Sequence, residues 1–175
     1  MQQASHKLPP TLLNEPPFKQ WSPSSLNARY MQQALEAAEK ALTKGEVPVG
    51  AVLVCDDSVP FSAYNLRECQ SDPTAHAEML VLRQAAQKLG RWRLGGTLYS
   101  TLEPCVMCAG ALVQARIDRL IFGAADTKAG GCGSVVDVVR DPRFNHRIEV
   151  FGGLMSEASS ALLQDFFKAL RQKSR

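Results

Sequence analysis

Two short stretches decide how this sequence folds and what it binds: Pro73-Thr74-Ala75-His76-Ala77-Glu78 and Glu103-Pro104-Cys105-Val106-Met107-Cys108. Between them they offer one imidazole and two thiols, a donor set typical of catalytic zinc sites, where three protein ligands leave the fourth tetrahedral position open for water. The candidate ligands are His76, Cys105 and Cys108. Glu78 is not needed as a ligand, so we expect it to carry protons in catalysis.

The spacing of the two cysteines has a physical explanation. Pro104 is a favourable first residue of a helix, and Cys105 and Cys108 would then share one helix face, with Cβ atoms roughly 5–6 Å apart. The free N–H groups and the positive dipole end of a helix start lower the pKa of a thiol. A helix start at this point therefore favours the thiolates that zinc requires.

A second helix is predicted to begin just before His76. Thr74 is a good N-cap residue, and the apolar positions after it recur at helical spacing. These positions are Met79, Leu80, Leu82, Ala85, Ala86 and Leu89. Two helix N-termini would thus converge on one metal ion.

Each motif taken alone fits other functions. Cys105-x-x-Cys108 at a helix start also fits a dithiol redox motif. A lone histidine such as His76 is more often a structural residue, and a lone glutamate such as Glu78 often only favours the helix dipole. The combination of His-x-Glu with Pro-Cys-x-x-Cys, however, is the signature of zinc nucleobase deaminases. We therefore interpret the two motifs together as a zinc hydrolase site.

Length and composition favour one domain. The chain has 175 residues, 45% of them hydrophobic, and a chain of this length buries roughly 70% of its unfolded surface. Residues 1–23 hold five prolines and little apolar periodicity, so we expect a disordered or loosely attached extension before a single domain at 24–175. No apolar run approaches the roughly 18 residues of a membrane span. Five cysteines without an evident pairing pattern fit a protein of the reducing cytoplasm.

The order of the apolar segments predicts an α/β fold. Helices are expected at about 24–45, 76–90, 105–115 and from 156 onward, and strands at 49–54, 59–64, 97–101, 119–122 and 148–151. Pro60 places the second of these strands at a sheet edge. The strand at 97–101, the helix after it and the strand at 119–122 should form a right-handed parallel unit. A three-layer α/β/α fold follows, with a mixed sheet and ligands at the carboxyl ends of its strands.

Longer segments resemble a known family. The segments are Gly45-Glu46-Val47-Pro48-Val49-Gly50-Ala51-Val52, Asp72-Pro73-Thr74-Ala75-His76-Ala77-Glu78, Thr101-Leu102-Glu103-Pro104-Cys105-Val106-Met107-Cys108-Ala109-Gly110 and Asn145-His146-Arg147. They are similar to bacterial-type tRNA-specific adenosine deaminases, and the resemblance covers roughly residues 26 to 172. It implies a cytidine-deaminase-like fold with a five-stranded mixed sheet, a zinc cofactor and a homodimer. The implied activity is conversion of the wobble adenosine of a tRNA anticodon stem-loop to inosine.

The same resemblance assigns residues to substrate binding. Asn65 matches a base-contacting residue, and Val47 with Leu102 matches the apolar walls of the base pocket. Asp126 matches a loop residue near the sugar, and Phe166-Phe167 matches a helix end that faces nucleic acid. Without the resemblance, simpler interpretations stay open. The asparagine and the aspartate are then turn residues, and the apolar side chains are core or packing residues.

The end of the chain is positively charged. Lys168, Arg171, Lys173 and Arg175 give a local charge of +4, whereas the whole chain carries +3. Cations near a helix C-terminus also favour its dipole, so charge alone is compatible with a solvated helix end; with the resemblance, we expect contacts to RNA phosphates. Deamination of a free base or nucleotide is the alternative if this helix is fully packed. Outside the enzymes, a zinc-stapled RNA-binding module or a dithiol redox protein is the alternative.

Overall fold

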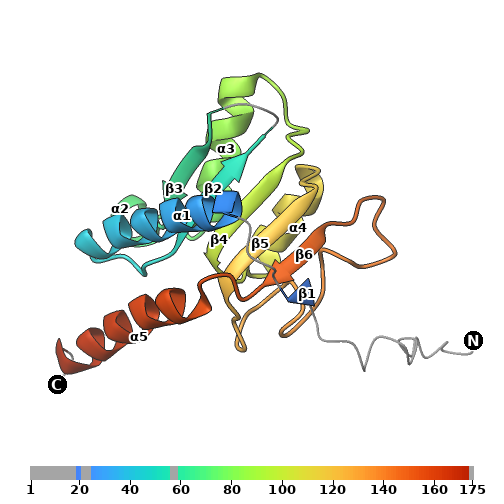
Figure 1. The fold of residues 1–175 in the computed structure, drawn as a ribbon. Coiled ribbons are helices and arrows are strands. Elements are labelled where there is room, and N and C mark those ends of the chain that lie inside the picture. The colour runs from blue at the N-terminus through green and yellow to red at the C-terminus, as the bar shows by residue number, and fades with distance from the viewer. Residues whose placement is uncertain (1–18, 21–24, 56–58, 174–175) are drawn as a thin grey trace, which may run out of the picture.

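A mixed β-sheet between two layers of helices forms the fold (Figure 1). The structure is a computed structural model that describes residues 19–20, 25–55 and 59–173. The helices are α1 (Ser25–Thr43), α2 (Arg67–Gln70), α3 (Ala77–Leu89), α4 (Val106–Gln114) and α5 (Ser156–Lys173). The strands are β1 (Lys19–Gln20), β2 (Gly50–Val54), β3 (Phe61–Tyr64), β4 (Thr97–Leu102), β5 (Arg119–Ala124) and β6 (Glu149–Gly152).

The sheet has the strand order β1-β6-β5-β4-β2-β3. β4, β5 and β6 run parallel to one another, whereas β2 runs antiparallel to both β4 and β3. The strands β2 to β6 confirm the predicted five-stranded mixed sheet, and β3 lies at an edge, as Pro60 predicted. The two-residue strand β1 extends the opposite edge beside β6. It was not predicted, because two residues are too few to show a period.

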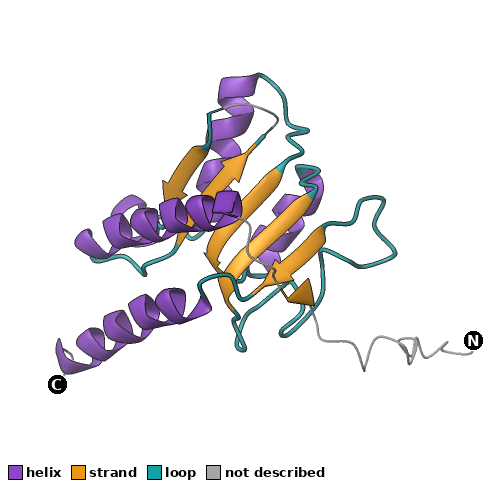
Figure 2. Cartoon of the chain, viewed as in Figure 1, coloured by secondary structure: helices purple, strands orange, loops and turns teal. Residues whose placement is uncertain are grey.

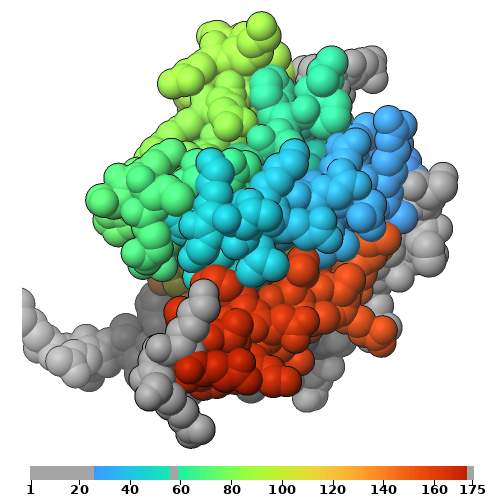
Figure 3. All heavy atoms as spheres, turned by 90° about the vertical axis from the view of Figure 1, so that its left-hand side faces the viewer, coloured from blue at the N-terminus to red at the C-terminus, as the bar shows by residue number. Residues whose placement is uncertain are grey.

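The helices cover both faces of the sheet. α1 and α5 lie on one face, and α3 and α4 lie on the other (Figure 2). α1 and α5 also lie side by side on their face (Figure 3). Successive residues of a strand point to opposite faces, so the central strands supply both cores. Val52, Tyr99 and Ile121 pack on the α1 side, and Leu53, Leu98 and Leu120 pack on the side of α3 and α4.

Two predicted helix starts need correction. Thr74 is not the N-cap of α3: its N–H and its hydroxyl both donate to Asp72 Oδ1 at 2.7 Å, and its oxygen accepts from Arg83 Nη2 at 3.1 Å. This local turn competes with capping for the threonine side chain, and His76 takes the N-cap position instead. Likewise, α4 begins at Val106, and Cys105 rather than Pro104 precedes the first helical residue. The short helix α2 was also not predicted.

The predicted extension, residues 1–23, lies outside the described residues except for the two that form β1. The last part of the predicted basic segment, Ser174 and Arg175, also lies outside them. In the described part of the chain, no helix is both long and apolar enough to cross a membrane.

The packing of α1 on β2 makes Gly50 a sensitive position. A Cβ atom there would lie 2.6 Å from Ala38 N and in still closer contact with the Ala34 carbonyl oxygen. We expect Gly50→Ala to destabilise the protein by about 1–3 kcal/mol through overpacking, as measured by urea denaturation. The matched control is Gly110→Ala in α4, where no atom lies within 4 Å of the added Cβ. We expect Gly110→Ala to increase the free energy of unfolding by about 0.5–1 kcal/mol. Equal stability of Gly50→Ala and the unmodified protein would contradict this account of the packing.

Candidate active site at two helix N-termini

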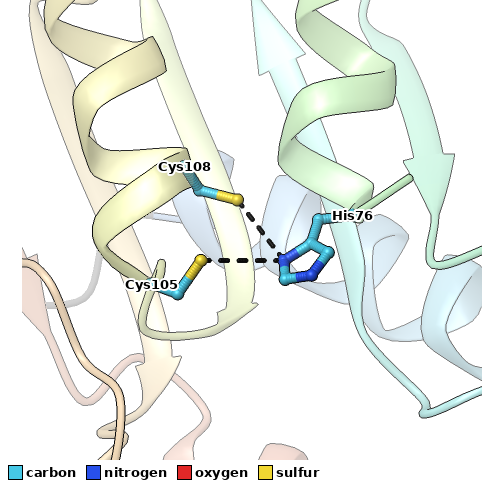
Figure 4. A group of neighbouring side chains, drawn as sticks. All are labelled: His76, Cys105 and Cys108. Carbon is cyan, nitrogen blue, oxygen red and sulfur yellow. Dashed lines mark hydrogen bonds between the residues drawn. The ribbon is translucent and has the colours of Figure 1, made fainter. Parts of the chain in front are cut away.

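His76 and Cys105 occupy equivalent positions at the starts of two helices. His76 is the N-cap of α3 and Cys105 is the N-cap of α4, both with extended backbone, at φ −74°, ψ 151° and φ −69°, ψ 173°. Neither side chain caps its own helix by a hydrogen bond. Both instead point toward each other and toward Cys108 in the first turn of α4 (Figure 4). The predicted convergence of two helix N-termini is therefore confirmed.

The three side chains form a compact donor cluster. His76 Nδ1 lies 3.7 Å from Cys105 Sγ and 3.5 Å from Cys108 Sγ (Figure 4). All three donor atoms lie within 4.8 Å of one another, and no other such group of three occurs in the described residues. Two donors bonded to one tetrahedral zinc ion at ~2.0–2.3 Å lie about 3.6 Å apart. The cluster therefore fits a zinc ion in both chemistry and spacing.

Glu78 stands next to this cluster. Its side chain lies in the first turn of α3 and is only 3% exposed. The Cys108 thiol donates to Glu78 Oε2 at 3.7 Å, and the Ser100 hydroxyl donates to Oε1 at 3.4 Å. Burial raises the pKa of the Glu78 carboxyl above its usual range. A buried carboxyl group with a raised pKa thus lies beside the candidate metal ligands.

The two cysteine thiols have pKa values shifted in opposite directions. A hydrogen bond from Cys108 lowers the pKa of Cys105 to about 3, with the His76 ring as a further contribution. The same hydrogen bond raises the pKa of Cys108. The lowered pKa of Cys105 favours the thiolate form that a divalent cation requires.

The loop after β5 is attached to this site through Glu103, a buried residue with 1% exposure. The Glu103 carboxylate accepts hydrogen bonds from Asp126 N at 3.0 Å, Cys132 N at 3.1 Å and Ser134 N at 3.0 Å, and also from the Ser134 hydroxyl. The loop in turn contacts the segment that carries Cys105, because Gly131 N donates to Pro104 O at 2.8 Å. Sequence reasoning did not assign this role to Glu103, since its partners lie more than twenty residues away along the chain.

The sheet register brings four predicted substrate-binding residues to one end of the sheet, the end at which β3, β4 and β5 finish. Gly50 pairs with Tyr64, Ala51 with Ser100, and Leu102 with Ala124. The start of β2 and the ends of β3, β4 and β5 therefore lie together at the end of the sheet where α4 begins. We call this the carboxyl edge of the sheet. The residues at or next to these strand ends are Val47, Asn65, Leu102 and Asp126.

These four residues differ in their surroundings. Asn65 is 5% exposed and donates from Nδ2 to Glu46 Oε2 at 3.0 Å. Val47 and Leu102 are partly buried against the main core. Asp126 caps its own loop, accepting from Lys128 N at 2.9 Å and Ala129 N at 3.1 Å.

Phe167 is not brought to the cluster. It lies on α5, which packs on the face of the sheet opposite to α3 and α4. Its ring is 43% exposed and meets Phe166 edge to face, with ring centroids 5.3 Å apart. The helix end around it is open to solvent, which is the opposite of the fully packed helix expected for a free-base enzyme.

Comparisons with known proteins agree with this geometry. A sequence model of the MafB19-like deaminase family matches residues 26–171. The tRNA-specific adenosine deaminase of Bacillus subtilis is 48% identical over 147 residues, which cover 83% of this chain and 91% of that protein. The tRNA-specific adenosine deaminase of Haemophilus influenzae is 46% identical over 154 residues, which cover 87% of this chain and 89% of that protein.

Solved structures show the same fold. A structure from work on A-to-I editing by tRNA:A34 deaminases at the wobble position of transfer RNA has 44% identity and a TM-score of 0.74, covering 77% of this chain and 99% of that one. A guanine deaminase from Nitrosomonas europaea has 26% identity and a TM-score of 0.69, covering 95% and 97%. The predicted cytidine-deaminase-like fold is therefore confirmed. The chain belongs to the MafB19-like deaminases and, among them, to the tRNA-specific adenosine deaminase family.

Proposed function

We propose that this protein is a zinc-dependent deaminase that converts adenosine to inosine at the wobble position of a tRNA anticodon, with release of ammonia. The observation that carries the proposal is the cluster of His76, Cys105 and Cys108 with the buried Glu78 beside it. The identity to tRNA-specific adenosine deaminases over most of the chain supports the choice of substrate.

The metal would be held by His76 Nδ1 and the two cysteine thiolates. Two soft sulfur donors and one imidazole suit zinc better than magnesium or calcium, which prefer oxygen. When bound, zinc supplies Lewis acidity that lowers the pKa of a coordinated water. Two thiolates and a neutral imidazole give a ligand set of charge −2, which cancels that of Zn²⁺. Such a neutral centre polarises water less than one with three histidines, so a nearby base is needed.

Glu78 is the base that the structure offers. In hydrolytic deamination, a C–O bond forms at C6 of adenine and the C6–N bond to the amino group breaks. The Glu78 carboxylate would accept a proton from the attacking water and give it to the ring nitrogen, and would then accept the proton of the new C6 hydroxyl and give it to the departing amine. Water and adenosine thus give inosine and ammonia, and Glu78 ends in its starting state. Its raised pKa suits a group that must both take and give a proton.

The base would bind at the carboxyl edge of the sheet, where β3, β4 and β5 end. We assign Asn65 to hydrogen bonding with the base, Val47 and Leu102 to the apolar walls, and Asp126 to the loop near the sugar. Their common position at the ends of neighbouring strands supports this assignment. The carboxyl edge of an open α/β sheet is also where ligands generally bind.

The exposed end of α5 supports an RNA substrate over a free base. Phe167, Lys168 and Arg171 are all exposed on this helix. A free nucleoside is too small to reach both the metal cluster and α5, whereas a stem-loop offers phosphates and flanking bases. Loop bases are also the easiest to move into a pocket, because they are already partly unstacked.

We further propose a cytoplasmic homodimer. Three exposed apolar side chains, those of Val106, Val135 and Val136, lie on α4 and on the loop that packs against it, with exposures of 53%, 51% and 45%. Burial of such side chains in a second copy of the chain would remove apolar surface from water. All five cysteines are free, which suits a reducing compartment.

Removal of a sulfur ligand tests the metal site. We expect Cys108→Ala to lose stoichiometric zinc, measured by mass spectrometry of the metal content under reducing conditions. It should also lower the melting temperature, because the link between two helix starts is lost. The matched control is Cys55→Ala, since Cys55 is equally buried but is not part of the donor cluster. Full zinc retention in Cys108→Ala would exclude the site as described.

A comparison of substrates tests the activity. We expect steady-state kcat/KM to be far higher for an anticodon stem-loop with a wobble adenosine than for duplex RNA or free adenosine, with inosine as the measured product. In the same assay, Glu78→Gln should keep zinc and fold but lose at least the ~10²–10⁴-fold typical of a general acid–base group. Glu39→Gln, an exposed residue of α1, serves as the control.

Two results would contradict these assignments separately. Comparable efficiency on free adenosine would exclude the RNA substrate and leave the deaminase chemistry intact. Near-normal turnover of Glu78→Gln would show that another group moves the proton.

Charge removal on α5 tests the RNA contact. We expect Lys168→Ala combined with Arg171→Ala to weaken stem-loop binding and to reduce the slope of log K against log salt by about 0.7 per lost phosphate contact. Fluorescence anisotropy over a salt series measures both. The control combines Lys88→Ala with Arg93→Ala, exposed cations near the opposite edge of the sheet. An unchanged slope in the α5 variant, or an equal change in the control, would show that α5 does not contact phosphates.

A further inference from the structure

Glu46 is a buried acid that the chemistry at the metal cluster does not use. It lies between α1 and β2, is 1% exposed, and follows Gly45, whose φ of 75° lets the helix end. A carboxylate at this depth has lost its hydration, which costs free energy unless hydrogen bonds replace the water. The retention of an acid here therefore calls for partners that only a carboxylate can satisfy.

Each oxygen of Glu46 has its own N–H donor. Asn65 Nδ2 donates to Oε2 at 3.0 Å, and Cys69 N donates to Oε1 at 2.8 Å. The two donors come from the end of β3 and from α2, which lie about twenty residues away along the chain. Glu46 thus connects the base-binding edge of the sheet to the short helix that precedes the metal ligand His76.

This arrangement fixes which way the Asn65 amide faces. An asparagine side chain has one carbonyl acceptor and two N–H donors. A carboxylate can only accept, so Asn65 must turn Nδ2 toward Glu46. Oδ1 and the second N–H are then left for a different partner. Within the described part of the chain, the bond to Glu46 is the one hydrogen bond that the Asn65 side chain forms.

We propose that Glu46 is a positioning residue that holds the Asn65 amide in one orientation for reading the base. This inference rests on the proposed function, in which Asn65 contacts the base. An amide held in one orientation presents a fixed pair of acceptor and donor, and so accepts only a base edge with the complementary pattern. An amide able to turn by 180° would accept the reverse pattern as well, and the site would lose both affinity and selectivity.

Glu46→Gln changes this orientation with little change in shape. Glutamine has a single acceptor oxygen, and if it keeps the bond from Cys69 N, its NH2 group faces Asn65. The Asn65 amide must then turn to accept this bond, which reverses the pattern presented to the base. The expected loss in kcat/KM is on the order of ten- to a hundredfold, the cost of leaving a buried donor or acceptor of the base or of Asn65 without its partner. The metal content and the fold should be unchanged.

A double-mutant cycle separates positioning from general support of the structure. We would measure kcat and KM on the anticodon stem-loop for the unmodified protein, Glu46→Gln, Asn65→Ala and the double variant. If Glu46 acts through Asn65, Glu46→Gln should cost ten- to a hundredfold alone but less than about twofold when Asn65 is already alanine. The same loss in both backgrounds would overturn the proposal. Glu39→Gln, with the same change of charge on exposed α1, should have no effect.

A second measurement does not depend on turnover. In ¹⁵N-labelled protein, the side-chain amide protons of Asn65 are identified by their absence in Asn65→Ala. We expect the proton that faces the Glu46 carboxylate to lie downfield and to lose this shift in Glu46→Gln. Unchanged amide resonances in Glu46→Gln would overturn the proposal. A wild-type protein inactive on the stem-loop would instead refute the proposed function, and the spectra would still decide whether Glu46 orients Asn65.

Discussion

The candidate site depends on two helix N-termini that meet at one edge of the sheet. His76 and Cys105 are both N-cap residues, and the extended backbone of an N-cap directs its side chain away from the helix axis. The parallel pairing of β4 and β5 places the start of α4 at the carboxyl end of β4. The unpaired N–H groups of both first turns add positive potential. Sulfur and carboxylate groups therefore gather here at little electrostatic cost.

Three buried glutamates surround this edge, and their partners explain their different roles. Glu103 accepts four hydrogen bonds from the loop after β5, so its carboxylate is fully occupied and serves structure. Glu46 accepts one strong N–H bond on each oxygen. The side-chain hydrogen bonds that Glu78 accepts from the described residues are long, from a thiol at 3.7 Å and a hydroxyl at 3.4 Å. The carboxylate with the longest side-chain hydrogen bonds is thus the one whose proton exchange they hinder least.

Patterns within short segments predicted those features of the fold that are determined by residues close together in the sequence. Strand periods predicted the five main strands, and the spacing of His76, Cys105 and Cys108 predicted one cluster. The N-cap at Thr74 was wrong because its hydroxyl donates to Asp72 and accepts from Arg83 instead of from a helix N–H. The bonds of Glu46 and Glu103 were out of reach for another reason. They join segments about twenty to thirty residues apart, and no period in the sequence reports such contacts.

The choice of substrate cannot lie in the fold or in the metal ligands. A guanine deaminase at 26% identity matches 95% of this chain, so one scaffold carries different base specificities. In the proposed reaction, water would attack an amino-bearing ring carbon, which both purines have, so the donor cluster would not distinguish them. Discrimination between substrates must therefore come from groups that hydrogen-bond to the base or that bind the neighbouring nucleotides of the RNA. For this protein we propose the Asn65 amide, with its bond to Glu46, as the first kind and the exposed end of α5 as the second. In this proposal a rigid amide would select the base, whereas exposed cations would select the polymer that presents it.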